Sequence, residues 1–150
     1  MWQTPKSSGR YHTTNSWSGP EESKLFKEVA DIKDILPGGM RSYSVDGKEI
    51  VLCNDGGKFY AFDRKCGHMG APLEMGTANG HIITCPLHAV QFDVDTGTAL
   101  SGPLIRYAVE PEPPGDNTSR WIMKLVAAAR TEDIRTYAVK IENGKIRVDL

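Results

Sequence analysis

The sequence has few of the features that mark secreted, membrane-spanning or nucleotide-binding proteins. Only three of its 150 residues are cysteine, which is too few to indicate a disulfide framework. There is no run of about eighteen apolar residues, so a membrane-spanning helix is not expected. No dinucleotide fingerprint, P-loop or G-x-S-x-G elbow is present, and the formal net charge of −1 favours neither nucleic acid nor a membrane surface as a partner.

The beginning of the chain differs in composition from the rest. Residues 1–23 are rich in Ser, Thr, Gly and Asn and have no hydrophobic periodicity, so we predict a flexible N-terminal tail followed by one domain over 24–150. The first residues lack the basic region and apolar core of a secretory signal, and they lack twin arginines. We therefore expect a cytoplasmic protein.

Short alternating segments separated by turn residues indicate an all-β fold of antiparallel sheets. Asp46-Gly47 and Asn143-Gly144 are two-residue hairpin signals between such segments. Cys53 stands in an apolar run and is predicted to be a buried core thiol. In the last hairpin, alternate apolar residues are predicted to face the core, namely Tyr137, Val139, Ile141, Ile146 and Val148.

One helix is predicted, near 119–130. Thr118 or Ser119 could cap it, and Trp121 and Leu125 fall on one apolar face. The favoured interpretation is that this face packs on its own domain, and the alternative is that it docks a partner or a second copy.

Two short clips carry the chemistry. The first is Cys66-Gly-His68, and the second, after sixteen intervening residues, is Cys85-Pro-Leu-His88. Each clip offers one thiolate and one imidazole, which together suit iron or zinc. Two such loops placed face to face can present both sulfurs to one metal ion and both nitrogens to another.

At these residues the sequence resembles the Rieske iron–sulfur family, in which two His replace two Cys on one iron of a [2Fe–2S] cluster. The resemblance assigns Cys66 and Cys85 to one iron. It assigns His68 and His88 to the other iron, which is expected to lie near the surface. The ring nitrogen of each histidine that does not bind iron, its outer nitrogen, is expected to be free to contact a partner. The resemblance also implies a cluster-binding subdomain at about 64–105. An insertion at about 106–135 separates this subdomain from the last hairpin.

Two other uses of these residues compete with an iron–sulfur cluster. A structural zinc ion could take the same four side chains, although zinc fingers usually separate their cysteines from their histidines. An oxygenase would need a second, mononuclear iron, for which only His12 and His81 would be left. These two are a poor ligand pair, so we predict electron transfer without catalysis.

The residues after the second clip bear on the reduction potential. High-potential Rieske proteins have a Ser and a Tyr two and four residues after the second His, where their hydroxyls donate to sulfur. This sequence has Val90 and Phe92 there, and it has Ala71 and Leu87 where high-potential members have a disulfide clamp. We therefore predict a potential at the low end of the Rieske range.

The resemblance thus predicts a soluble Rieske-type ferredoxin that carries single electrons from a reductase to a terminal oxygenase. The alternative is a tightly bound electron-transfer subunit of a larger oxidoreductase, such as a nitrite reductase or hydroxylase complex, docked through the 106–135 insertion. A zinc-stabilised binding module is the third hypothesis. The sequence leaves the identity of the partners and the oligomeric state open.

Overall fold

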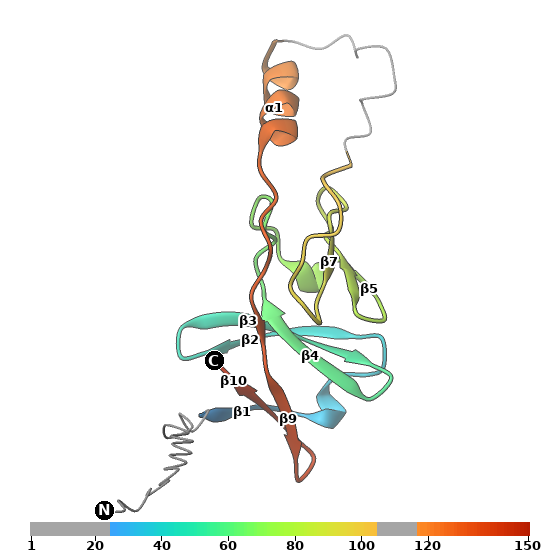
Figure 1. Ribbon diagram of the computed structural model, residues 1–150, viewed down its shortest axis with the longest axis vertical. Coiled ribbons are helices and arrows are strands. Elements are labelled where there is room, and N and C mark those ends of the chain that lie inside the picture. The colour runs from blue at the N-terminus through green and yellow to red at the C-terminus, as the bar shows by residue number, and fades with distance from the viewer. Residues whose placement is uncertain (1–24, 105–116) are drawn as a thin grey trace, which may run out of the picture.

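The computed structural model describes residues 25–104 and 117–150, which form three antiparallel sheets, two 3₁₀ turns and one helix (Figure 1). This confirms the predicted all-β class with one short helix. The predicted N-terminal tail and the first part of the predicted insertion lie outside the described residues. Within the described part of the chain, no helix has the length and apolar character needed to cross a bilayer.

The central sheet has four strands in the order β2-β3-β4-β8. Their bounds are Met40–Val45, Lys48–Asp55, Lys58–Asp63 and Thr136–Tyr137. The predicted turn between β2 and β3 is present, with φ of 49° at Asp46 and 78° at Gly47. Both residues have the positive φ that a tight hairpin with strongly twisted strands requires.

A second sheet has the order β1-β10-β9, and a third has the order β5-β6-β7. The strands of the second are β1 Phe26–Asp31, β9 Val139–Glu142 and β10 Lys145–Asp149. Those of the third are β5 Thr77–Asn79, β6 Ile82–Thr84 and β7 Gln91–Asp93. The 3₁₀ turns are η1 Ile32–Asp34 and η2 Leu73–Met75.

Strand β3 is buried on both faces because successive side chains point to opposite sides of a sheet. Ile50 and Leu52 join a core shared with the β1-β10-β9 sheet. Val51 and Cys53 join a second core, which includes residues of the β5-β6-β7 sheet. The central sheet is therefore the layer on which the other two are mounted, and the buried state predicted for Cys53 is confirmed by its exposure of 0%.

The last hairpin confirms most of the predicted core positions and corrects one. Ile146 and Val148 are fully buried, and Tyr137 and Val139 pack against the same core. Ile141 is 44% exposed, contrary to prediction. It lies on β9, which is the edge strand of its sheet, so it has a neighbouring strand on one side only.

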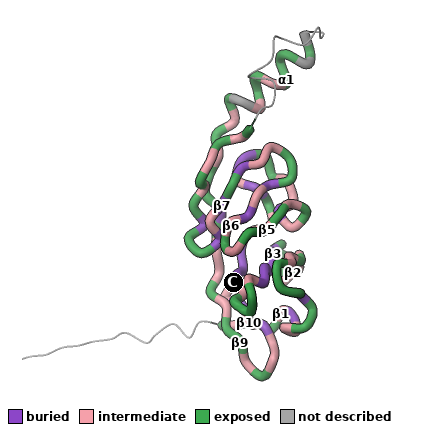
Figure 2. Tube along the Cα trace, turned by 90° about the vertical axis from the view of Figure 1, so that its right-hand side faces the viewer, coloured by how far each residue is buried: buried purple, intermediate pink, exposed green. Residues whose placement is uncertain are grey.

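Helix α1 spans Asn117–Ala128, and it stands at the end of the molecule beyond the β5-β6-β7 sheet (Figures 1 and 2). It begins before Thr118 and Ser119, so neither residue is its cap as predicted. The apolar side chains expected to pack on the domain are exposed instead, with Trp121 at 62% and Leu125 at 48%. The favoured packing prediction is therefore wrong for these residues.

Candidate functional site

Two loops of matching design carry the four predicted ligands. In the first, the backbone N–H of Cys66 donates to the carbonyl of Ala71 at 2.9 Å. In the second, the N–H of Cys85 donates to the carbonyl of Val90 at 2.8 Å. Both bonds span five residues, so each loop is closed at its cysteine and holds its histidine within the turn.

The two loops bring like side chains together. Cys66 and Cys85 belong to one buried core cluster and interact with each other. The rings of His68 and His88 meet edge to face, with their centroids 5.0 Å apart and their planes at 86°. The structure thus pairs thiol with thiol and imidazole with imidazole.

The surroundings of Cys66 affect its protonation. Burial raises the pKa of this thiol, the backbone N–H groups of His68 and Met69 lower it, and the neighbouring Cys85 raises it again. The net direction is upward, so Cys66 is a neutral thiol in the metal-free chain and must lose its proton when a metal binds. The two N–H groups then donate to the sulfur and stabilise the thiolate.

The histidines present nitrogen atoms suited to a metal. The Nδ1 atom of His88 is buried and has no hydrogen-bond partner. Burial, and then the nearby His68, lower the pKa of His88, which keeps its ring neutral at neutral pH. The Nε2 atom of His68 lies 3.0 Å from the carbonyl oxygen of Val126. A ring that donates through Nε2 keeps its lone pair on Nδ1, so both histidines can offer Nδ1 to a metal ion.

This donor set fits a two-iron cluster better than a single ion. Among the described residues, no three His, Cys, Asp or Glu side chains gather to hold one metal ion. A tetrahedral zinc site needs three or four protein ligands on one ion, whereas each iron of a Rieske cluster takes only two. The unpartnered Nδ1 of His88 is a buried polar atom that such a group would satisfy.

The sequence profile of the Rieske [2Fe-2S] domain matches residues 26–111. The chain belongs to the Rieske [2Fe–2S] family. The ferredoxin component of the naphthalene 1,2-dioxygenase system of Pseudomonas putida is 35% identical over 123 residues, which cover 82% of this chain and 93% of the relative. The predicted cofactor, a [2Fe–2S] cluster, and the predicted class, a ferredoxin that carries electrons and is not itself an enzyme, are thereby confirmed.

Solved structures agree with this assignment. The ferredoxin of carbazole 1,9a-dioxygenase from Nocardioides aromaticivorans IC177 has a TM-score of 0.59 and 29% identity, with 82% of this chain and 95% of that chain covered. A ferredoxin solved in complex with the reduced oxygenase of a carbazole 1,9a-dioxygenase has a TM-score of 0.62 and 24% identity, over 84% of this chain and 94% of that chain. The latter likeness shows the Rieske fold.

The other residues named from the sequence have varied positions. His81 has a half-exposed side chain near Asp93, at 3.8 Å, and is not part of the loop pair. His12 lies outside the described residues. The loop at 101–104 returns to the second clip, because the N–H of Leu104 donates to the carbonyl of His88 at 2.8 Å.

Two contacts of the first loop could not be read from the sequence. A Cβ at Gly67 would collide with the backbone carbonyl of Glu132, so this position requires glycine. The outer ring nitrogen of His68, Nε2, was expected to be free, but it forms a hydrogen bond with the carbonyl oxygen of Val126. Both partners lie in or just after α1, in the predicted insertion.

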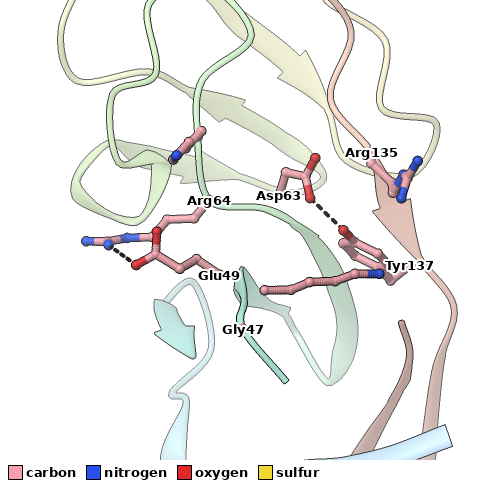
Figure 3. Close-up of a pocket in the computed structure, with 8 residues that line it drawn as sticks. Gly47, Glu49, Asp63, Arg64, Arg135 and Tyr137 are labelled. Atoms are coloured by element: carbon pink, nitrogen blue, oxygen red, sulfur yellow. Dashed lines mark hydrogen bonds and ion pairs between the residues drawn. The ribbon is translucent and has the colours of Figure 1, made fainter. Parts of the chain in front are cut away.

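Ion pairs of Arg64 hold the start of the first ligand loop in place. Arg64 contacts Glu49 at 2.8 Å and Glu74 at 2.7 Å, which ties the end of β4 to β3 and η2. Arg64 and Glu49 border a polar hollow of about 310 Å³, where the hydroxyl of Tyr137 also donates to the carboxylate of Asp63 (Figure 3). None of the residues that line the hollow is a cysteine or a histidine, so it is separate from the four predicted ligands.

Proposed function

We propose that this chain is the ferredoxin of an oxygenase system, which takes one electron from a reductase and delivers it to a terminal oxygenase. The observation that carries the proposal is the pairing of two thiols and two imidazoles on twin loops. The relatives support it, since their names place them as ferredoxin components of naphthalene, 2,4-dinitrotoluene and biphenyl dioxygenases.

Within this proposal, Cys66 and Cys85 hold one iron through their sulfurs. His68 and His88 hold the other through Nδ1. The bound cluster would supply one-electron chemistry, and the protein would hold it, keep water away from the thiolates and leave His88 partly exposed. Leu73 is fully buried in the same core cluster as Cys66 and Cys85, so it suits the role of keeping water from the sulfurs.

The surface near the ligands suits a brief encounter. Met69 and Leu87 stand beside the two ligating histidines in sequence and are 52% and 58% exposed. A few apolar side chains around the place where the electron leaves give a small interface, which forms and separates quickly, as an electron carrier requires. We also propose a cytoplasmic location, as expected from the sequence, and a domain of residues 24–150 with the subdivisions given above.

The test begins with anaerobic purification and EPR spectroscopy. We expect no signal in the oxidised protein, a rhombic S = 1/2 signal after reduction by one electron, and two iron atoms and two sulfides per chain. The reduced protein should then be reoxidised by the terminal oxygenase of the naphthalene dioxygenase system. A single bound zinc ion, or a cluster that this oxygenase leaves reduced, would contradict the proposal.

A further inference from the structure

The two paired histidines have unequal surroundings. His68 is only 9% exposed, and its Nε2 is bonded to the carbonyl oxygen of Val126. His88 is partly exposed although its Nδ1 is buried, so the exposed part of the residue is not the nitrogen that would face a metal. Among the described residues, no group forms a hydrogen bond to the ring of His88.

The acceptor of the His68 bond belongs to the last turn of α1. The carbonyls of a helix's final turn have no partner within the helix. Ala129 donates its N–H to the carbonyl of Leu125 at 2.9 Å, and the next carbonyl, that of Val126, receives the imidazole of His68. The C-terminal end of a helix carries partial negative charge, so it is a favourable site for an imidazole N–H.

The position of α1 over His68 is fixed by the chain that leaves the helix. The N–H of Glu132 donates to the carbonyl of Gly67 at 2.9 Å, one residue before His68. Gly67 has no Cβ, and only this lets the backbone at Glu132 come so close. The next residue, Asp133, accepts the N–H of Ala99 at 2.8 Å. The end of the helix is thus anchored to the same loop that carries the covered histidine.

We infer that α1 closes the imidazole of His68 to partners, so that electrons enter and leave through His88. This rests on the proposed function. In each transfer one electron passes from the reduced ferredoxin to its acceptor, and no covalent bond changes. Val126 acts as a positioning residue through its backbone carbonyl. Because a hydrogen bond from the outer nitrogen makes an imidazole a more basic ligand, the contact also stabilises the oxidised state and lowers the reduction potential.

Acylation of the outer ring nitrogen by diethyl pyrocarbonate tests the covering. The oxidised holoprotein is treated for increasing times, and each histidine is followed by peptide mass spectrometry, with His81 as the exposed reference. In the wild type we expect His68 to react about tenfold more slowly than His88, which corresponds to a protecting interaction of about 1.4 kcal/mol. Equal rates at the two residues in the wild type would overturn the inference without any variant.

A matched pair of proline substitutions tests the role of the helix. Val126→Pro breaks the last turn of α1, whereas Thr118→Pro lies in the first turn, where proline is tolerated. We expect Val126→Pro to bring the acylation rate of His68 up to that of His88 and to raise the reduction potential measured by voltammetry. Thr118→Pro should leave both quantities at the wild-type value.

The outcomes separate this inference from the proposed function. A wild type without the S = 1/2 signal would overturn the proposed function. A wild type with that signal, in which Val126→Pro changes neither the acylation of His68 nor the potential, would overturn the inference alone. An identical change in both proline variants would also overturn it, because the effect would then not depend on the end of the helix that contacts His68.

Discussion

Gly70 and Ala89 occupy the same place in the two ligand loops. Each directly precedes the residue whose carbonyl closes its loop, and each has a positive φ, 75° for Gly70 and 56° for Ala89. Only one of the two is glycine, so the second loop holds an alanine in a backbone conformation that disfavours a Cβ.

This difference between the loops predicts unequal effects on stability when glycine and alanine are exchanged at the two positions. Gly70→Ala should lower the free energy of unfolding by about 1 kcal/mol, since a Cβ is strained at this φ although it has space. Ala89→Gly should change it little, because relief of strain is offset by the greater freedom of the unfolded chain. Thermal unfolding of the holoprotein should show a midpoint about 3–5 °C lower for the first variant only. Equal losses in both would contradict this account of the loops.

Removing a proposed ligand should remove the cluster. In His88→Asn the buried Nδ1 site loses its imidazole, so we expect the visible absorption and the reduced-state EPR signal to disappear and the bound iron to fall to a small fraction of two per chain. His81→Asn is the matched control, because His81 lies outside the loop pair with a half-exposed side chain. It should keep the full iron content. Retention of the cluster in His88→Asn would refute the assignment of this ligand.

The sequence was sufficient to predict features whose parts are close along the chain. Each clip holds its cysteine and histidine within four residues, and the hairpin at Asp46-Gly47 is encoded by the turn itself. The hydrogen bond between His68 and Val126 joins residues 58 positions apart and uses a backbone acceptor. Every residue type has a backbone carbonyl, so the sequence gives no sign of this contact.

The wrong predictions of buried side chains on α1 and β9 have a common cause. Periodicity identified the apolar faces of α1 and β9, but it carries no information on whether a neighbour covers them. Trp121 and Ile141 are exposed because α1 stands beyond the domain and β9 is an edge strand. Gly67 shows the same limit of sequence-based prediction. A side chain is excluded at this position because the backbone of Glu132, far along the chain, lies too close for a Cβ.

The reduction potential should respond to a hydroxyl at position 90. We expect the wild-type potential near the low end of the Rieske range, at about −150 mV. Val90→Ser should raise it by about 40 mV, the value for a one-electron centre that gains a hydrogen bond of about 1 kcal/mol to sulfur. Val94→Ser controls for the loss of buried methyl groups, since Val94 is 2% exposed in the same core. Voltammetry should show no shift for Val94→Ser, and equal shifts would mean that packing and not a hydroxyl sets the potential.

The hydroxyl of Tyr137 should stabilise the fold in a pH-dependent way. It donates to the carboxylate of Asp63 at 2.6 Å and joins β8 to the end of β4 (Figure 3). Burial, and then the bond to Asp63, raise the pKa of Tyr137 to about 12. Because the unfolded chain loses this proton near pH 10, at lower pH than the folded protein, the contribution is complete below about pH 10 and is lost as the pH rises towards 12.

Tyr137→Phe should therefore lower the free energy of unfolding by about 1.5 kcal/mol at pH 8, at the low end for a charged acceptor because the residue is only half-buried. The difference from the wild type should shrink between pH 10 and 12. Tyr43→Phe is the control, since the hydroxyl of Tyr43 is buried without a hydrogen-bond partner and its removal should be neutral or stabilising. Denaturant titrations of the holoprotein measure both effects. A similar loss in the two variants would show that the Tyr137 hydroxyl contributes through packing and not through Asp63.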